Sequence, residues 1–506
     1  MDEAADFMIR RVLIANRGEI ARRIMRTCRA MGIESVAIYS DADAHALHTR
    51  EADFAEPVGP APASQSYLNI TQVIDAARRA GADAVHPGYG FLSERGEFAD
   101  ACVEAGLTFV GPPASVIRGM GSKTAARATM IAAGVPVVPG ETPADQSPAA
   151  IAKAVRAVGL PALLKAAAGG GGKGMRVIRE SSEVDDAIVA ARTESERAFG
   201  DGTLYVERLI EHARHIEVQI FGDTHGNVVH VLERDCTLQR RHQKVIEEAP
   251  APRLSPKVRA TLLDAAVAAA KAVGYVNAGT IEFILEGDGD EARFYFLEMN
   301  TRLQVEHPVT EAVTGLDLVR AQLLVASGAP LPFTQADVRA SGHAIECRVY
   351  AEDARRLLPQ SGRLLMYREP VGDGIRVDAG VAEGDTVTVH YDPLIAKLIT
   401  HGDTRDEAID RMTSSLLSYD ILGLRHNISF LLALLRREEV RDSRVHTRFI
   451  EEQLDALAAP PDAGLVRAAA AIAAWAATRQ TSPVTLSGED DLSALDPWTL
   501  IKSVAW

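Results

Sequence analysis

The chain of 506 residues contains little cysteine, and its cysteines do not form pairs. The four of them, Cys28, Cys102, Cys236 and Cys347, lie far apart, and none has the C-x-x-C spacing of a zinc site or a redox motif. Isolated thiols of this kind argue against a disulfide framework and favour a reduced, cytoplasmic protein. We therefore expect domains that each depend on their own hydrophobic core.

The chain also lacks a surplus of positive charge and a long apolar run. Its 54 basic and 69 acidic side chains give a net charge of −15, which argues against broad nucleic-acid binding because that requires a positive footprint. The N-terminus, MDEAADFMIRR, is acidic where a secretory signal is basic. The most apolar late stretch, residues 468–477, is too short to span a bilayer. Neither nucleic acid nor a membrane is therefore an expected partner.

No internal repeat is visible, but the chain has a clear order of elements. Residues 10–110 alternate short apolar strands with helical patterns, which predicts a parallel sheet whose ligands bind beyond the carboxyl ends of the strands. A small α+β unit is expected over 140–210. Strands with one central helix follow over 211–335, then a β-rich block over 342–400 and a helical end.

The most glycine-rich segment is LLKAAAGGGGKGMRVI, residues 163–178, and it matches neither of two common phosphate-binding loops. A Walker A loop has Ser or Thr after its lysine, whereas Lys173 is followed by Gly174. Gly169, Gly171 and Gly174 satisfy G-x-G-x-x-G, but a dinucleotide fingerprint must open a helix. The residues that follow, MRVIRE, predict a strand instead.

The same segment fits a flap made of two antiparallel strands and a long glycine turn. Backbone N–H groups of such a turn can fold over phosphates, and Lys165 at the end of the first strand adds a positive charge. A plain hairpin tip is the alternative. Ordering so many glycines costs conformational entropy, and a tip needs only one or two of them, so we favour the flap.

A predicted hairpin further along the chain places two glutamates opposite each other. The strands TIEFIL (280–285) and FYFLEMN (294–300) are joined by a polar, glycine-containing connection. If the turn centres on Asp290, Glu282 faces Glu298 among apolar neighbours. Two facing, partly buried carboxylates share a proton or hold a cation, and with phosphates nearby we favour magnesium. The alternative is that one glutamate is exposed on an edge strand.

The stretch EMNTRLQVEH (298–307) carries polar side chains at alternate positions. In an extended chain these positions line one face, and Pro308 is expected to end the strand. The residues on that face are Glu298, Asn300, Arg302, Gln304 and Glu306. Acid, amide and guanidinium groups in one row suit a small anion beside a metal, although an ordinary half-solvated strand has the same pattern.

A second polar cluster lies in ERDCTLQRRHQKVIEEAP (233–250). Its dense, mostly cationic run is Gln239, Arg240, Arg241, His242, Gln243 and Lys244. A charged run is usually a solvated face, but this one lies between strand patterns, just ahead of the helix that leads to the carboxylate hairpin, so we favour the active site. Cys236 has no activating neighbour in the sequence and is expected to be a packed thiol rather than a nucleophile.

Taken together, these motifs resemble biotin carboxylase, a member of the ATP-grasp superfamily. The matching stretches occur in the family's order and cover residues 10 to about 450. They are VLIANRGEIARRI, HPGYGFLSE, FVGP, GSKTAAR, LLKAAAGGGGKGMRVI, RHIEVQI, ERDCTLQRRHQKVIEEAPAP, FYFLEMNTRLQVEHPVTE and GHAIECRVYAED. The segment GIRVDAGVAEGDTVTVHYDPLIAKL is most similar to the biotin-carboxylating α subunits of acyl-CoA carboxylases.

The resemblance implies a fold of mixed α/β and α+β class. An N-terminal Rossmann-like domain is expected over 1–122, and an ATP-grasp domain over 123–335 with a mobile lid at about 138–210. A β-rich C-terminal domain is expected over 336–457. Residues 458–506 resemble a helical or linker segment at the start of a truncated domain. The chain has no Met-Lys-Met biotinylation motif, so we expect either a fragment or a carrier on another chain.

The family's chemistry implies the ligands and partners. ATP phosphorylates bicarbonate, with Mg²⁺ or Mn²⁺ as cofactor, and the carboxyl group passes through carboxyphosphate to biotin on a carrier domain. The implied partners are that carrier and a carboxyltransferase subunit, in a homodimer or a larger hetero-oligomer. The alternatives are another ATP-grasp ligase that joins a carboxylate to an amine, and a non-catalytic scaffold of a carboxylase complex.

Matching motif positions also imply a role for each site residue. The residues implied to contact ATP are Lys123, Lys165, the lid glycines Gly169, Gly170, Gly171, Gly172 and Gly174, Glu207 and Leu209 at the adenine, His215 at the ribose, and Gln239 and His242. Those implied to hold the metal are Glu282, Glu298 and Asn300. Lys244, Arg302, Gln304 and the Val305 backbone are implied at bicarbonate, Glu306 as the general base, and Arg348 at the biotin enolate. Ala167 stands where relatives often carry serine, which changes the expected lid contacts.

Overall fold

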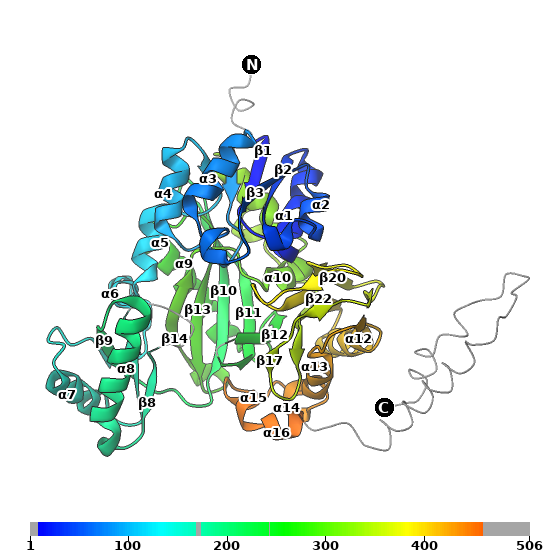
Figure 1. Cartoon of the computed structure of the whole chain (residues 1–506). Helices are drawn as coiled ribbons and strands as arrows, with labels where there is room; N and C mark the ends of the chain where they lie inside the picture. Colours follow the sequence, from blue (N-terminus) through cyan, green and yellow to red (C-terminus); the bar gives the residue numbers. More distant parts are fainter. Residues whose placement is uncertain (1–8, 168–173, 242, 459–506) are drawn as a thin grey trace, which may run out of the picture.

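The computed structural model describes residues 9–167, 174–241 and 243–458. Figure 1 shows three regions around a long central sheet: an N-terminal domain above it, a small lobe at one lower side, and a C-terminal region at the other. Within the described ranges, no helix has the length and apolarity that a membrane crossing requires.

The N-terminal domain contains the predicted parallel sheet, with strand order β3-β2-β1-β4-β5. Asn69 caps α3 by accepting a hydrogen bond from the Gln72 amide, and Gly32, whose φ of 71° suits glycine, caps the C-terminal end of α1. The elements are β1 (Arg11–Ile14), α1 (Gly18–Met31), β2 (Glu34–Ser40), α2 (Leu47–Glu51), β3 (Phe54–Gly59), α3 (Ile70–Arg79), β4 (Ala84–His86), α4 (Gly96–Glu104) and β5 (Thr108–Phe109).

The central sheet has eight antiparallel strands, and it continues from the expected ATP-grasp region into the expected C-terminal domain. The connection is the pairing of β12 with β15. In sheet order the strands are β14 (Arg293–Asn300), β13 (Asn277–Glu286), β10 (Arg214–Gly222), β11 (Val228–Arg240), β12 (Gln243–Ala249), β15 (His343–Tyr350), β22 (Leu394–Gly402) and β20 (Ile375–Ala379). Because the two regions share one sheet, strand pairing fixes the positions of their side chains relative to each other.

Helices connect and cover this sheet. The predicted central helix is α9 (Pro256–Ala272), capped by Ser255, whose hydroxyl accepts from the Val258 amide, with proline in its first turn. Its buried face packs with β-strand residues such as Ile281 and Phe283 in one hydrophobic cluster. The other helices of this region are α5 (Ala114–Gly121), α6 (Lys123–Ala132), α10 (His307–Thr314) and α11 (Leu318–Ala326).

The predicted α+β unit is the small lobe in Figure 1, and its strand order is β6-β9-β7-β8. β7 and β8 are antiparallel, as the flap interpretation of the glycine-rich segment predicts. The glycines between them, residues 169–172, lie outside the described residues. The elements are β6 (Gly140–Glu141), α7 (Pro148–Val158), β7 (Ala162–Ala166), β8 (Arg176–Ile178), α8 (Val184–Phe199) and β9 (Leu204–Arg208).

The C-terminal region combines the last strands of the long sheet with helices and short hairpins. Leu398, Ile409 and Phe430 belong to its core. The short strands pair as β16 (Glu352–Asp353) with β17 (Leu358–Pro359), β18 (Gly362–Arg363) with β21 (Thr386–Val387), and β19 (Met366–Arg368) with β23 (Asp420–Leu422). The helices are α12 (Arg405–Leu417), α13 (Ile428–Leu435), α14 (Glu438–Arg441), α15 (Phe449–Glu452) and α16 (Leu454–Leu457).

A largely buried ion pair fastens α12 to the long sheet. Glu248 of β12 accepts from Arg405 Nε at 2.6 Å and lies 2.7 Å from His343 Nε2, and its side chain is 13% exposed. Burial acts to raise the pKa of Glu248, but His343 and Arg405 lower it to about 2. The ionised carboxylate therefore stabilises the folded state above a pH of about 4.5, and this contribution is lost as the pH falls toward 2.

We expect Glu248→Gln to lower the free energy of unfolding by about 3 kcal/mol at pH 7, because it leaves a mostly buried arginine without its counter-charge. The difference from wild type should shrink as the pH falls below about 4.5. Urea unfolding at several pH values measures both effects. Glu291→Gln is the control, since that side chain is 95% exposed and its change should cost under about 0.5 kcal/mol. A loss that did not vary with pH would contradict this origin.

Candidate active site

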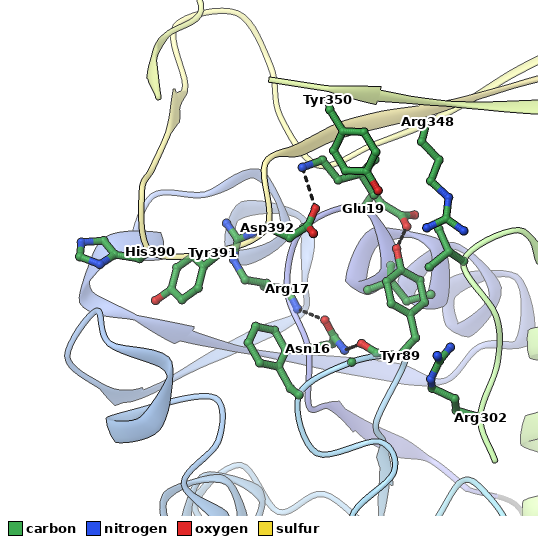
Figure 2. A pocket seen from close by; sticks show the side chains of 16 residues that line it. Asn16, Arg17, Glu19, Tyr89, Arg302, Arg348, Tyr350, His390, Tyr391 and Asp392 are labelled. Atoms are coloured by element: carbon green, nitrogen blue, oxygen red, sulfur yellow. Dashed lines mark hydrogen bonds between the residues drawn. The ribbon is translucent and has the colours of Figure 1, made fainter. Parts of the chain in front are cut away.

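Two cavities meet in the middle of the molecule and share three residues. The first, about 520 Å³, lies between the N-terminal domain and the C-terminal region (Figure 2), and the second, about 420 Å³, lies over β13 and β14. Arg302, Val305 and Arg348 line both. The sequence-predicted residues that line the second cavity are Lys123, Lys165, His215, Gln239, Lys244, Glu282, Glu298, Asn300 and Gln304. The structure thus brings together most of the predicted side chains.

The facing carboxylates occur as the hairpin predicts. Glu282 on β13 pairs directly with Glu298 on β14. Burial acts to raise the pKa of Glu282, but Lys244 and His215 lower it well below its usual range. At Glu298, burial and the charge of Glu282 both raise the pKa. The charge of Glu282 is therefore balanced by neighbouring cations, while the charge of Glu298 is disfavoured by the charge of Glu282.

This donor set fits a divalent cation. Within the described ranges, no lysine, arginine or histidine nitrogen lies within 4.0 Å of the Glu298 carboxylate, so its charge is left for an added cation to balance. Asn300 donates from Nδ2 to Glu282 Oε1 at 2.7 Å, which brings a third oxygen-bearing side chain to the pair. Carboxylate and amide oxygens are the ligands that Mg²⁺ takes when phosphates complete its shell.

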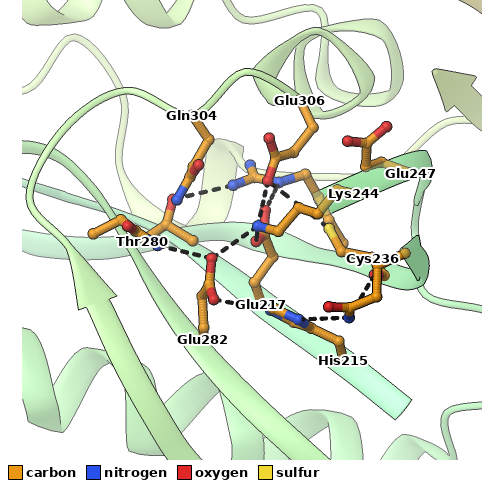
Figure 3. A network of polar contacts seen from close by, with 12 residues as sticks. His215, Glu217, Cys236, Lys244, Glu247, Thr280, Glu282, Gln304 and Glu306 are labelled. Carbon is orange, nitrogen blue, oxygen red and sulfur yellow. Dashed lines mark hydrogen bonds and ion pairs between the residues drawn. The ribbon is translucent and has the colours of Figure 1, made fainter. Parts of the chain in front are cut away.

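Lys244 on β12 lies at the centre of a ring of acids (Figure 3). Its ammonium is 2.5 Å from Glu217, 2.8 Å from Glu282 and 2.6 Å from Glu306. Burial acts to lower the pKa of Lys244, but these carboxylates raise it well above its usual value, so the ammonium stays protonated. Arg234 is fully buried beside the ring and donates to Glu217 at 2.5 Å. The ring therefore holds one fixed positive charge between three carboxylates.

Glu306 is held from two sides. Arg348 on β15 donates from Nη2 to Glu306 Oε2 at 2.9 Å, and from Nε to Glu247 at 2.5 Å, while Lys244 holds the other oxygen of Glu306. Burial acts to raise the pKa of Glu306, but Lys244 and Arg348 lower it well below 4.5. Glu306 is therefore an ionised carboxylate at neutral pH, fully buried behind Arg348, which lines both cavities.

The expected extended strand over 298–307 is only partly present. β14 ends at Asn300, and α10 begins at His307, so Pro308 lies in the first turn of a helix instead of ending a strand. Proline suits that place because a first-turn N–H needs no partner inside the helix. The side chains on the turn between these elements still converge: Arg302 donates to Gln304 Oε1 at 3.0 Å and to Asn300 Oδ1 at 3.3 Å. The row is a wound loop rather than one face of a strand.

The two predicted phosphate-binding lysines lie at the root of the lobe. Lys165 on β7 is buried and donates to Glu207 at 2.5 Å, and Arg127 donates to the other oxygen of Glu207 at 3.0 Å. Lys123 begins α6, and its amide donates to the Ala167 carbonyl at 3.3 Å, which joins α6 to the end of β7. Burial lowers the pKa of Lys123, although Glu298 acts to raise it.

The residues implied to contact the nucleoside also lie here. The amide of Leu209 donates to the Pro161 carbonyl at 3.1 Å. His215 lies 3.1 Å from Glu282 and 3.2 Å from the amide of Gln239. Gly174 has a φ of 71°, and a Cβ there would lie 2.8 Å from Ala166, so glycine is required where β8 approaches β7. His242 and residues 169–172 lie outside the described residues.

The cationic run of 239–244 is mostly not a solvated face. Gln239 and Lys244 line the second cavity, while Arg240 pairs with Glu352 at 3.0 Å. Cys236 is fully buried, 3.9 Å from Glu306, and burial raises the pKa of its thiol well above the usual value. The expectation of a packed thiol is consistent with that environment.

Sequence reasoning missed several residues of the site. Glu217 is one ligand of the Lys244 ammonium, and Glu247 is the second acid on Arg348. Glu19 and Tyr89 contact each other at the wall of the first cavity (Figure 2). The three glutamates lie in apolar strand or helix patterns, and Tyr89 lies in the loop that follows β4. Only the register of the long sheet and the packing of the N-terminal domain bring them to the site.

Comparison with protein families agrees with this arrangement. Residues 8–117 match the model of the biotin carboxylase N-terminal domain, and residues 346–452 match that of the biotin carboxylase C-terminal domain. Between them, residues 122–334 match the ATP-binding domain of the carbamoyl-phosphate synthase L chain.

Curated and solved relatives are similar over nearly the same length. The mitochondrial methylcrotonoyl-CoA carboxylase subunit alpha of Glycine max is 53% identical over 444 residues, 88% of this chain and 60% of that protein, so the chain spans about three fifths of this relative. Biotin carboxylase 2 of Bacillus subtilis (strain 168) is 48% identical over 447 residues, 88% of this chain and 100% of that protein.

Two crystal structures have the same fold. The biotin carboxylase–βγ-ATP complex from Campylobacter jejuni superposes with a TM-score of 0.86 at 43% identity, covering 88% of this chain and 100% of that one. The biotin carboxylase domain dimer of Hydrogenobacter thermophilus 2-oxoglutarate carboxylase, in complex with MgADP, ADP and bicarbonate, superposes at 0.84 and 43% identity, covering 89% and 99%.

The fold places an ATP-grasp domain between a parallel-sheet domain and an antiparallel C-terminal region, which defines a member of the ATP-grasp class. Within that class, the chain belongs to the biotin carboxylase family.

Proposed function

We propose that this protein carboxylates biotin on a carrier domain, using ATP and bicarbonate, as the first half-reaction of an acyl-CoA carboxylase. One observation carries the proposal: two separate cavities share Arg302, Val305 and Arg348, and the ionised Glu306 lies behind that shared wall. A reaction that passes a carboxyl group from a phosphorylated intermediate to a second substrate needs this arrangement, because the two substrates must meet without a path through bulk water.

The second cavity suits the nucleotide. Lys123 and Lys165 contribute positive charge for the phosphates, and Lys165 lies on β7, which pairs with β8. Glu282 and Glu298, with Asn300 beside them, would hold Mg²⁺ or Mn²⁺, which when bound neutralises phosphate charge. Glu207 holds the Lys165 ammonium at the end of β7 through its 2.5 Å contact.

Glu306 is the general base for bicarbonate. Bicarbonate is a weak nucleophile until its remaining proton is removed, and a carboxylate beside it can take that proton as the bicarbonate oxygen attacks the γ-phosphoryl group and ADP leaves. Arg302 and Gln304 supply donors for the anion at the edge of the second cavity, and the Lys244 ammonium supplies positive charge beside them. The product, carboxyphosphate, breaks down to carbon dioxide and phosphate next to the wall that the two cavities share.

The first cavity suits the biotin ring. Arg348 reaches the shared wall from β15, and its guanidinium is positioned by Glu247 and Glu306. The phosphate released from carboxyphosphate takes the proton of the ureido nitrogen, negative charge then collects on the ureido oxygen, and a fixed guanidinium stabilises that charge. Carbon dioxide released beside Val305 is then within reach of the nitrogen. The backbone of Val305 therefore forms part of both steps.

The proposal includes partners beyond this chain. The biotin is carried by a separate domain, a carboxyltransferase subunit uses the product, and the protein acts as a homodimer or in a larger hetero-oligomer. Similarity to a methylcrotonoyl-CoA carboxylase subunit supports an acyl-CoA carboxylase, whose acyl-CoA the carboxyltransferase selects. The free thiols of the chain support a cytoplasmic location, whereas the name of the plant relative places that protein in mitochondria.

Free biotin should stimulate bicarbonate-dependent ATP hydrolysis by this protein. The expected result is slow phosphate release with ATP, Mg²⁺ and bicarbonate, and faster release when biotin is added, because biotin consumes the carbon dioxide at the shared wall. A coupled phosphate assay with and without each substrate measures this. Stimulation by an amine instead would support the rival ATP-grasp ligase, and no hydrolysis under any condition would support the scaffold.

A further inference from the structure

Lys397 lies in the middle of β22 with a fully buried side chain, at a point where three parts of the chain meet. Its ammonium donates to the carbonyl oxygen of Val305 at 2.7 Å and lies 3.3 Å from Glu19 Oε1. Glu19 belongs to α1 of the N-terminal domain, and Val305 to the turn between β14 and α10. One lysine therefore connects the C-terminal region, the N-terminal domain and the loop that carries Glu306.

Glu19 extends this connection to the wall of the first cavity. The hydroxyl of Tyr89 donates to the same Oε1 atom that faces Lys397, and the two side chains point at each other in Figure 2. Tyr89 lines the first cavity together with Val305 and Arg348. The second oxygen of Glu19 is buried and has no hydrogen-bond partner among the described residues. The ion pair of Lys397 and Glu19 thus connects Val305 and Tyr89, two parts of the cavity wall that come from different regions of the chain.

Stability does not explain this pair. Removing two charges from water costs about as much as their attraction returns, and an apolar pair of the same volume is often equally stable. Burial raises the pKa of Glu19 to about 7, with Lys397 acting in the opposite direction, which indicates how costly its charge is at this place. Asp378, paired with Lys397 across β20 and β22, supplies a further negative charge beside the ammonium.

We propose that Lys397 and Glu19 are positioning residues that hold the Val305 carbonyl and the Tyr89 ring in a fixed relation to Arg348. Neither side chain needs to touch a substrate. Because Glu306 directly follows Val305, the anchor on the Val305 carbonyl also sets the direction in which the Glu306 side chain leaves the backbone. This role rests on the proposed function, since it assigns to the pair the alignment of the base with the biotin cavity.

Two variants test the anchor, and one is designed to fold. Lys397→Met keeps the length of the side chain but leaves the buried Glu19 without its cation, so it can fail to fold, although Asp378 keeps Arg26 and Arg376. Glu19→Gln replaces a carboxyl group whose protonated, neutral form is already accessible near neutral pH, and the new amide still offers an oxygen to Tyr89. Glu248→Gln is the matched control, because it weakens another ion pair of the same sheet whose partners, His343 and Arg405, lie away from both cavities.

Amide hydrogen exchange of residues 301–306 is the readout that needs no activity. We expect exchange in this segment, measured relative to the core amides of the same variant, to rise by about tenfold or more in Glu19→Gln, and in Lys397→Met if it folds, but not in Glu248→Gln, whose destabilisation acts on the whole fold. In steady-state assays, biotin-dependent kcat should fall by about 10²-fold while the KM for ATP stays within about twofold, since a misplacement of roughly 1 Å costs that much.

Each outcome decides the proposal. Exchange that is unchanged in Glu19→Gln, or that rises equally in Glu248→Gln, overturns the positioning role, and so does loss of turnover without faster exchange in 301–306. Faster exchange in that segment with a selective loss of biotin-dependent kcat supports it. If the wild-type protein shows no biotin-dependent turnover, the proposed function fails, while the exchange experiment still decides whether the pair anchors Val305.

Discussion

Glu306→Gln should abolish biotin-dependent turnover while the protein still folds and binds ATP. The variant removes the carboxylate that takes the proton of bicarbonate, and loss of a general base typically costs about 10²–10⁴-fold in rate. Lys123 and Lys165 do not contact Glu306, so the KM for ATP should stay within about twofold. Phosphate release with bicarbonate, with and without biotin, measures the loss.

The fold should tolerate this substitution because every cation that Glu306 contacts keeps another acid. Lys244 retains Glu217 and Glu282, and Arg348 retains Glu247. A matched control is Glu352→Gln. Glu352 is a buried residue of the short strand β16 that pairs with Arg240, and neither residue lines either cavity. Its turnover should stay near wild type. Unchanged turnover in Glu306→Gln would remove Glu306 as the base.

The local patterns of the sequence predicted the parallel sheet, the flap strands and the carboxylate hairpin correctly. Each depends on short-range signals: strand–helix alternation for residues 10–110, and a polar turn near Asp290 that fixes the register of Glu282 with Glu298. Such signals act over a few residues and survive packing. The family resemblance, carried by motifs in a fixed order, was confirmed by matches to all three parts of the chain.

The extended conformation expected after Asn300 was wrong for a physical reason. Alternation of polar and apolar residues is compatible with a strand, but Pro308 in a first helical turn and the need to bring Arg302 back toward Asn300 favour a wound loop. The contacts among these side chains follow from the loop, and spacing along the chain does not specify them. The predicted neighbours were therefore found together in a different backbone conformation.

The ring around Lys244 and the anchor at Lys397 could not be predicted because they depend on long-range pairing. Lys397 is brought opposite Arg348 only by the register of β15 with β22, and Glu19 reaches it across a domain boundary. In the sequence, a lysine within LIAKLIT has no mark that separates it from a surface lysine. Buried charges of this kind become visible only when the burial of the whole sheet is known.

Arg348→Lys should separate the two half-steps of the proposed reaction. Lysine keeps the positive charge but cannot hold Glu247 and Glu306 at once and also present a planar group to a ureido oxygen, because it lacks the guanidinium fork. Biotin-dependent turnover should fall by about 10²–10³-fold, as expected when a group that stabilises developing negative charge is lost. Slow phosphate release with bicarbonate alone should persist, since Lys123, Lys165 and the carboxylate pair are unchanged.

The ratio of the two rates makes this test specific to Arg348. Glu306→Gln should lower hydrolysis with and without biotin together, because both require an activated bicarbonate, whereas Arg348→Lys should lower only the biotin-dependent part. The control is Arg240→Lys, which replaces an arginine of the neighbouring strand pair that holds Glu352 and lines neither cavity. Parallel losses in both assays for Arg348→Lys would show that Arg348 acts on Glu306 and not on biotin, and its role would then be to position the base.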